Sequence, residues 1–284
     1  MFTQDTLKGK NILITGGGGG LGAAFAERYA ELGANLVLCG RTQATLDAAA
    51  ERIRSHGTQV LTYATDIRDY EAVGRMFDHA TAQLGPINGL MNNAGANFLA
   101  ASEDLSPNGF KAIVDIVLHG TFNCTQHFGK RLIEQKLPGS VISIVTTYTE
   151  TGGAFVLPSA CAKAGVYALT NSLAYEWATY GIRVNSSAPG PFPTEGAWSR
   201  LMPSQQFEQA YVGKLPTGRV GEKWEIANLA VFLMSDLAPY IPGDCVVIDG
   251  GERLQGAEFN YSAQMAPRDQ LKAVFQQMRS RKQD

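Results

Sequence analysis

Cysteine is scarce in this chain, and its placement excludes the two structures that cysteines usually build. The 284 residues contain 4 cysteines, which lie far apart and show no C-x-x-C spacing: Cys39, Cys124, Cys161 and Cys245. Neither a disulfide framework nor a cysteine-rich metal site is therefore expected, and buried free thiols in a reducing compartment are the simpler interpretation. We predict no metal centre.

A strong net charge and long apolar runs are also missing. The formal net charge is only −2, so no overall field would attract nucleic acid or a membrane surface. No apolar run approaches the roughly 18 residues that a membrane-spanning helix needs. The first residues, MFTQDTLKGK, lack a signal core and an arginine-rich amphipathic stretch, and the final RKQD is not a peroxisomal signal. We expect a cytoplasmic protein; the alternative is that a transit peptide has been removed.

Short apolar stretches alternate with longer helical stretches along most of the chain. The expected strands cover residues 11–15, 36–39, 60–63, 89–91, 141–145, 183–185 and 245–248. The clearest helices cover residues 21–32, 42–55 and 70–83. Strands that alternate with helices in this way indicate βαβ units. We therefore predict the α/β class: a single doubly wound Rossmann domain over residues 1–284, with a parallel seven-stranded sheet and helices on both faces.

Two segments fall outside this alternation. Residues 191–218 carry no strand signal, and we interpret them as a lid over the site. Residues 252–284 are a C-terminal extension, and its last part places four apolar side chains on one helical face: Leu271, Val274, Phe275 and Met278. Such a stripe packs more often on its own domain or on a sister subunit than on a membrane.

A glycine-rich turn follows the first expected strand and opens the first expected helix. It reads Thr15-Gly-Gly-Gly-Gly-Gly-Leu21-Gly22. A flexible turn is the alternative, but the position between strand and helix favours a dinucleotide site. Glycines there let a pyrophosphate approach the N–H groups at the helix N-terminus. The candidate cofactor contacts are Thr15, Gly16, Gly18, Gly20, Leu21 and Gly22.

The end of the second expected strand indicates which cofactor is used. It reads Cys39-Gly40-Arg41-Thr42 and contains no carboxylate. NAD enzymes usually place Asp or Glu about 20 residues after the glycine turn, to hold the ribose 2′-hydroxyl. Arg41 can instead pair with a 2′-phosphate, the alternative being a solvated surface arginine. We predict NADPH as the cofactor.

Three motifs in order resemble the short-chain dehydrogenase/reductase family. They are the Gly16-x-x-x-Gly20-x-Gly22 turn, Asn92-Asn93-Ala94-Gly95 and Pro189-Gly190-Pro191-Phe192, within residues of about 8 to 252. The resemblance implies further cofactor contacts at Asn93, Ala94, Gly95, Pro189, Gly190 and Phe192. Asp66 resembles the family aspartate that contacts adenine, and a helix N-cap is an equal alternative.

The reaction residues usual in that family are largely replaced. Lys163 matches the family lysine, but Ser159 stands four residues earlier, where the family tyrosine is expected. A serine hydroxyl is too weak an acid to replace a phenol. Val117 and Thr146 stand where asparagine and serine are usual. Ketone–alcohol chemistry is therefore not the predicted reaction, and a different tyrosine, Tyr148, lies fifteen residues before Lys163.

A longer resemblance accounts for these replacements. The stretches Thr146-Thr-Tyr148-Thr-Glu-Thr-Gly152, Asn92-Asn-Ala-Gly-Ala-Asn97-Phe98 and Gly196-Ala-Trp-Ser-Arg200-Leu201 are similar to 2,4-dienoyl-CoA reductases of the mitochondrial, NADPH-using type. The resemblance implies a catalytic set of Tyr148, Asn97, Ser159 and Lys163, the lysine also holding the nicotinamide ribose. It implies acyl-CoA contacts from Arg68, Phe98, Ser106 and Arg200. A homo-oligomer, specifically a tetramer, and a role in the oxidation of unsaturated fatty acids are further expectations.

The residues also suit that chemistry on physical grounds. Hydride delivery to the distal carbon of a dienoyl thioester moves negative charge to the thioester oxygen, as an extended enolate. Hydrogen-bond donors at that oxygen are the main requirement, and the Tyr148 phenol and the Asn97 amide are suitable. The final proton can come from water. The alternatives are reduction of another enoyl or ketoacyl thioester, and a catalytically silent NADP-binding module.

Overall fold

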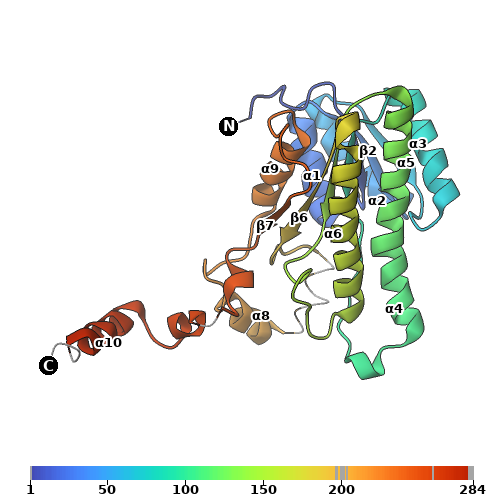
Figure 1. Cartoon of the computed structure of the whole chain (residues 1–284). Helices are drawn as coiled ribbons and strands as arrows, with labels where there is room; N and C mark the ends of the chain where they lie inside the picture. Colours follow the sequence, from blue (N-terminus) through green and yellow to red (C-terminus); the bar gives the residue numbers. More distant parts are fainter. Residues whose placement is uncertain (1, 196–197, 199–201, 203, 258, 281–284) are drawn as a thin grey trace.

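Seven parallel strands form the centre of the molecule (Figure 1), in the order β3-β2-β1-β4-β5-β6-β7. The computed structural model describes residues 2–195, 198, 202, 204–257 and 259–280. The strands are β1 (Asn11–Thr15), β2 (Asn35–Gly40), β3 (Val60–Ala64), β4 (Gly89–Asn92), β5 (Gly139–Ile144), β6 (Ile182–Pro189) and β7 (Cys245–Ile248). The predicted seven-stranded parallel sheet is therefore confirmed, with β6 longer than expected.

Helices cover both faces of the sheet. One face carries α1 (Gly20–Glu31), α2 (Gln43–Ile53) and α9 (Lys223–Met234). The other carries α3 (Tyr70–Leu84), α5 (Gly120–Gln135) and α6 (Leu157–Trp177). The helix α4 (Pro107–Val114) continues through a π-helical segment, Asp115–His119, into α5. Among the described residues, no helix has both the length and the apolar character needed to cross a membrane.

The strands are apolar because each is buried on two sides. In β1, Ile12 and Ile14 pack against the α1 face, whereas Leu13 packs against the α3 face. Successive side chains of a strand point to opposite faces, so a doubly covered strand needs apolar residues at nearly every position. The order of the strands reverses at β1, which pairs with both β2 and β4. In open α/β sheets this reversal creates the crevice in which ligands bind.

The thiols differ from one another more than expected. Cys39 and Cys124 are buried, Cys245 is half-buried and Cys161 is exposed. The expectation of buried free thiols is therefore wrong for Cys161, which lies on the outer side of the first turns of α6. Burial raises the pKa of Cys39 to about 12, so this thiol stays protonated at neutral pH.

The predicted lid and the C-terminal extension both contain helices. Within the described part of residues 191–218 there is no strand, and α8 (Gln205–Val212) begins at an N-cap serine, Ser204. After β7 the chain forms η5 (Glu252–Leu254), η6 (Asn260–Gln264) and α10 (Arg268–Ser280).

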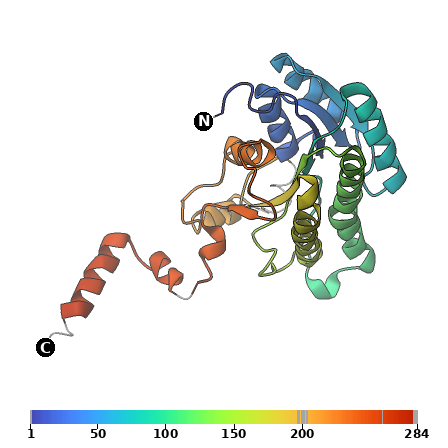
Figure 2. The same ribbon diagram turned by 45° about the horizontal axis from the view of Figure 1, so that its top comes forward.

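Figures 1 and 2 show the last of these helices running away from the domain. The apolar stripe of α10 is exposed: Val274 is 49%, Phe275 44% and Met278 61% accessible. The expectation that this stripe packs on its own domain is therefore wrong for the single chain. Packing on a sister subunit remains a prediction.

Candidate active site

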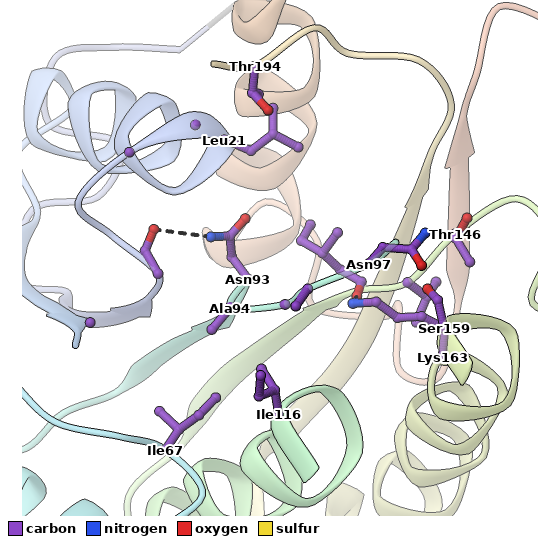
Figure 3. A pocket seen from close by; sticks show the side chains of 18 of the residues that line it. Leu21, Ile67, Asn93, Ala94, Asn97, Ile116, Thr146, Ser159, Lys163 and Thr194 are labelled. Carbon is purple, nitrogen blue, oxygen red and sulfur yellow. Dashed lines mark hydrogen bonds between the residues drawn. The ribbon is translucent and has the colours of Figure 1, made fainter. Parts of the chain in front are cut away.

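A cavity of about 580 Å³ opens where the strand order reverses, at the carboxyl ends of the central strands. A volume of this size falls in the range of small-molecule and cofactor sites. Figure 3 shows Asn93 and Ala94 on one side and Asn97, Ser159 and Lys163 on the other. The predicted site residues that line it are Gly16, Gly20, Leu21, Arg41, Asp66, Asn93, Ala94, Gly95, Asn97, Tyr148, Ser159, Lys163 and Pro189.

The glycine turn has the geometry of an anion-binding loop. Gly16 has φ +67° and Gly20 has φ +56°, which side-chain-bearing residues rarely adopt. A Cβ atom on Gly22 would lie 2.1 Å from the carbonyl oxygen of Gly16, so only glycine fits there. The N-cap of α1 is Gly19, which offers no side chain to the first N–H groups of the helix. These N–H groups are therefore available to a pyrophosphate.

Thr15 joins the glycine turn to the segment after β4 and does not itself line the cavity. Its buried hydroxyl oxygen accepts hydrogen bonds from the backbone N–H groups of Asn93 and Ala94, both at 3.0 Å. The side-chain amide of Asn93 donates in return to the backbone oxygen of Thr15 at 3.0 Å. Gly18 faces away, because a Cβ there would approach Thr45 at 3.1 Å. The predicted cofactor contacts Thr15, Gly18 and Gly22 are thus positions that shape the loop.

The Pro189-Gly190-Pro191-Phe192 motif behaves in the same way. Pro189 lines the cavity, whereas Gly190 donates its N–H to the backbone oxygen of Ile248 at 2.9 Å. Phe192 is buried in the core, and a Cβ on Gly221 would lie 2.3 Å from its ring. Gly190 and Phe192 therefore shape the loop without lining the cavity.

The charged groups at the end of the cavity near β2 form a small network. Arg41 lines the cavity and is exposed. Asp66 accepts hydrogen bonds from the Arg68 guanidinium, the shortest at 2.6 Å, and these bonds hold the pKa of Asp66 below its ordinary value. The N-cap of α3 is Asp69, whose carboxylate accepts from the N–H of Ala72 at 2.9 Å. The alternative that Asp66 caps this helix is therefore wrong.

The catalytic candidates meet at the phenol of Tyr148. The Asn97 side-chain amide donates to the Tyr148 hydroxyl at 3.3 Å. The same hydroxyl lies 3.2 Å from the Ser159 hydroxyl, which is 97% buried in the first turn of α6. Tyr148 therefore occupies the neighbourhood of the serine although the two residues are eleven positions apart in sequence.

Lys163 lies one helical turn beyond Ser159, on the same side of α6 (Figure 3). Its ammonium donates a hydrogen bond to the backbone oxygen of Ile144, at the end of β5. Burial lowers the pKa of Lys163 to about 8. A cofactor hydroxyl bound in this cavity would lie beside the Lys163 ammonium, which is only partly solvated.

The three described residues among the predicted acyl-CoA contacts do not line the cavity. Arg68 is engaged with Asp66, and Phe98 packs against the apolar cluster that contains Ile113 and Val117. Ser106 is the N-cap of α4, where it accepts from the N–H of Gly109 at 3.1 Å. Arg200 lies outside the described residues.

Several lining residues had no place in the sequence predictions, and two of them, Thr194 and Ile116, are informative. Thr194 follows the proline-rich motif and lies 3.6 Å from where Gly20 would carry a Cβ atom, which closes the cavity over the glycine turn. In the sequence, the position of Thr194 two residues after that motif is the feature that could have indicated its place in the cavity wall. Ile116 lines the cavity from the π-helical segment, and apolar periodicity alone does not distinguish it from its neighbours.

Comparison with known proteins places these features in a family. The family model described as enoyl-(acyl carrier protein) reductase matches residues 17–252. A Bacillus subtilis protein named probable 2,4-dienoyl-CoA reductase [(2E)-enoyl-CoA-producing] is 41% identical over 251 residues, covering 88% of this chain and 99% of the relative. A Caenorhabditis elegans protein named probable 2,4-dienoyl-CoA reductase 3 [(3E)-enoyl-CoA-producing] is 42% identical over 269 residues, which cover 93% of this chain and 86% of the relative.

Solved structures agree with the sequence relatives. The crystal structure of a short chain dehydrogenase from Bacillus anthracis has a TM-score of 0.82 and 41% identity, covering 89% of this chain and 100% of that one. The family model covers most of the glycine turn and of the cavity wall. The chain belongs to the short-chain dehydrogenase/reductase family.

Proposed function

We propose that the protein is an NADPH-dependent 2,4-dienoyl-CoA reductase. Membership of the family makes it an oxidoreductase, and the names of its relatives support a reaction at a carbon–carbon double bond. The observation that carries the finer proposal is the contact of Asn97 and Ser159 with the hydroxyl of Tyr148 beside Lys163. Tyr148 and Asn97 thus offer two hydrogen-bond donors close together in the cavity, although Ser159 replaces the tyrosine that the family usually carries on α6.

These donors suit the charge that develops in the reduction of a dienoyl thioester. A nicotinamide cofactor held by the glycine turn and Lys163 would supply the hydride that adds to the distal carbon of the diene. The electrons move through the conjugated system to the thioester oxygen, where Tyr148 and Asn97 donate hydrogen bonds to the enolate. Protonation of this enolate at C2 leaves a 3E double bond, and protonation at C4 leaves a 2E double bond. Both outcomes occur among the names of the relatives, so the product is a question for experiment.

The cavity supports NADPH as the reductant. The glycine turn and the uncapped start of α1 suit a pyrophosphate, and Lys163 suits the nicotinamide ribose. Arg41 suits a 2′-phosphate at the end of β2, where no carboxylate competes with it.

The test is NADPH consumption with a hexadienoyl-CoA, compared with a simple ketone, a 3-ketoacyl-CoA and a 2-enoyl thioester. We expect the dienoyl thioester to be reduced well and the ketone hardly at all. Preferential reduction of the 2-enoyl or ketoacyl thioester would favour another reductase of the family. Cofactor binding without turnover of any of the four would favour a silent NADP-binding module. Chromatographic analysis of the product identifies the position of the remaining double bond.

A further inference from the structure

Residues 191–221, which include the predicted lid, form a loop that is closed at its base; we call it the lid segment. The N–H of Gly221 donates to the backbone oxygen of Pro191 at 2.9 Å. A Cβ atom on Gly221 would lie 2.3 Å from the Phe192 ring, so the two ends of the loop are in close contact. A loop tied only at its base can open and close. The position of Thr194 over the cavity therefore depends on contacts farther from that base.

Such contacts lie at α8, in the far part of the lid segment. The phenol of Tyr211 on α8 donates a hydrogen bond to the carboxylate of Glu252, the first residue of η5, and both side chains are half-buried. A hydrogen bond to an ionised carboxylate is roughly twice as strong as one between neutral groups. The side-chain amide of Gln255 also donates to the backbone oxygen of Lys214 at 2.7 Å. Figure 1 shows α8 beside the chain that leaves β7, and these bonds fasten the two together.

The partner of α8 is itself fixed to the sheet. The carboxylate of Asp249, directly after β7, accepts hydrogen bonds from the N–H groups of Gly251 and Arg253, both at 2.9 Å. These bonds hold the turn that presents Glu252. A Cβ atom on Gly251 would lie 3.1 Å from Pro216, so the turn also packs closely on the chain after α8. Glu252 is therefore a fixed point, and Tyr211 is the group that it holds.

From Tyr211 the contacts continue to the wall of the cavity. The rings of Tyr211 and Trp198 meet edge to face, with centroids 6.3 Å apart and an interplanar angle of 70°, which is a favourable aromatic arrangement. The N–H of Trp198 donates to the backbone oxygen of Thr194 at 3.1 Å. Thr194 lines the cavity over the glycine turn, 3.6 Å from where Gly20 would carry a Cβ atom (Figure 3). A continuous set of contacts thus joins the end of β7 to the cover of the glycine turn.

We propose that Tyr211 is a positioning residue for cofactor binding: held by Glu252, it keeps Thr194 over the glycine turn. The inference rests on the proposed function, because it takes the ligand of that turn to be a nicotinamide cofactor. Tyr211 and Glu252 do not line the cavity, so they act on the ligand only through Trp198 and Thr194. Loss of the bond between phenol and carboxylate loosens the cover and speeds the release of the cofactor.

The first test compares Tyr211→Phe and Glu252→Gln with two matched controls. The controls are Tyr240→Phe, at a side chain that is 96% exposed, and Glu51→Gln, at an exposed acid of α2. Stopped-flow fluorescence measures the rate at which NADPH dissociates in the absence of any acyl substrate. We expect both variants to release NADPH about tenfold faster, in line with the loss of one charge-assisted hydrogen bond. The association rate and both controls should match the wild type. Unchanged dissociation in the two variants would overturn the proposal.

A double variant separates positioning from general destabilisation. Thr194→Ala trims the cover itself and should also speed NADPH release. If Tyr211 acts through Thr194, then Tyr211→Phe should add little in the Thr194→Ala background, because the group that it positions has been removed. Factors that multiply in the double variant would show that Tyr211 affects the protein by another route, and the proposal would be wrong. Hydrogen–deuterium exchange of residues 205–212 checks the anchor, since these residues should exchange faster in Glu252→Gln than in the wild type.

These measurements fail separately from the proposed function. A wild type that binds NADPH but reduces no dienoyl thioester contradicts the proposed reaction, and faster release from Tyr211→Phe still supports the positioning role. A wild type that prefers NADH contradicts the role of Arg41, and the release rates are then compared with NADH. A wild type that binds neither nucleotide contradicts both proposals.

Discussion

The hydroxyl of Tyr148 has two polar neighbours and no acidic one, which suits a hydrogen-bond donor to an enolate oxygen. Tyr148→Phe keeps the ring and removes this donor, so we expect kcat with a dienoyl thioester to fall by roughly 10²–10³. NADPH affinity should hardly change, since the phenol faces the reacting end of the cavity. Steady-state kinetics and a fluorescence titration of NADPH measure the two effects. A near-normal kcat, with hydride transfer shown to limit the rate, would make Tyr148 a structural residue.

Arg41 should decide between the two nicotinamide cofactors. Its guanidinium lines the cavity at the end of β2, so Arg41→Ala removes the expected partner of the 2′-phosphate. A charge-assisted hydrogen bond contributes about 1.5–3 kcal/mol, which corresponds to a loss of roughly tenfold or more in NADPH affinity. NADH lacks the phosphate, and its affinity should stay nearly constant. Equal losses for both cofactors in calorimetric titrations would contradict the assignment.

Lys163 should make cofactor binding depend on pH. Burial lowers its pKa from 10.5 to about 8, so the ammonium is present below that pH and is lost as the pH rises through it. A neutral amine is a weaker donor to ribose hydroxyls and no longer attracts an anionic cofactor. We therefore expect NADPH affinity to weaken between about pH 7 and 9, and Lys163→Met to bind more weakly with a flatter pH profile. An identical profile in the variant would assign the titration to another group.

Among the elements, the pairing of α3 with α5 contains a buried imidazole that should respond to acid. His127 contacts the backbone oxygen of Tyr70 at 3.0 Å through Nε2, and Arg131 donates to Nδ1 at 2.9 Å. Because Arg131 only donates, the ring is neutral with its proton on Nε2. Burial is the main cause that lowers the pKa of His127 below 6.5.

The sign of the effect follows from that shift. The unfolded chain takes up this proton more readily than the folded one, so the contribution to stability is present above pH 6.5 and is lost as the pH falls below it. We expect Tm to drop between pH 7.5 and 5.5 by more in the wild type than in His127→Gln. His79→Gln, at an exposed histidine of α3, is the control and should keep the wild-type slope. Equal slopes for all three proteins in thermal melts would exclude His127 as the cause.

The helices and strands were predictable because each has a pattern that depends only on burial. Strands covered on two sides read as apolar runs, and the glycine turn is constrained because a Cβ atom on Gly22 would lie 2.1 Å from the backbone oxygen of Gly16. Contacts that depend on the exact start of a helix were not predictable. Asp66 and Asp69 are both carboxylates near the start of α3, and only the structure shows that Asp69 caps it while Asp66 binds Arg68.

The cofactor side of the candidate site was easier to predict from the sequence than the substrate side. On the cofactor side, Gly16 follows from the short-range spacing of the glycine turn, and Asn93 and Lys163 follow from the family resemblance; all three line the cavity. The substrate side depends on how loops fold back. Thr194 returns to the glycine turn, and Glu252 reaches α8, through packing between segments distant in sequence. No local pattern specifies such contacts.

For the whole molecule, the projecting arm is the feature that bears on assembly. We propose that the apolar stripe of α10 packs on a sister subunit within a homo-oligomer, because it is exposed on the single chain. Removal of residues 267–284 should leave each domain folded, since the arm runs away from it, and should lower the melting temperature only through the lost subunit contacts. The mass in light scattering should fall below that of the full chain. A truncated protein of unchanged subunit number would contradict this role.

The spread of the cavity residues along the chain also affects how the protein is made. The wall begins at Gly16 and is complete only with Glu195. A ribosome that adds about 5–20 residues per second needs on the order of ten to forty seconds for that stretch. During that time the nascent chain carries the glycine turn without the opposite wall. A nicotinamide cofactor that needs the whole wall is therefore not an early template for folding; it can stabilise the protein only after β6 has been synthesised and added to the sheet.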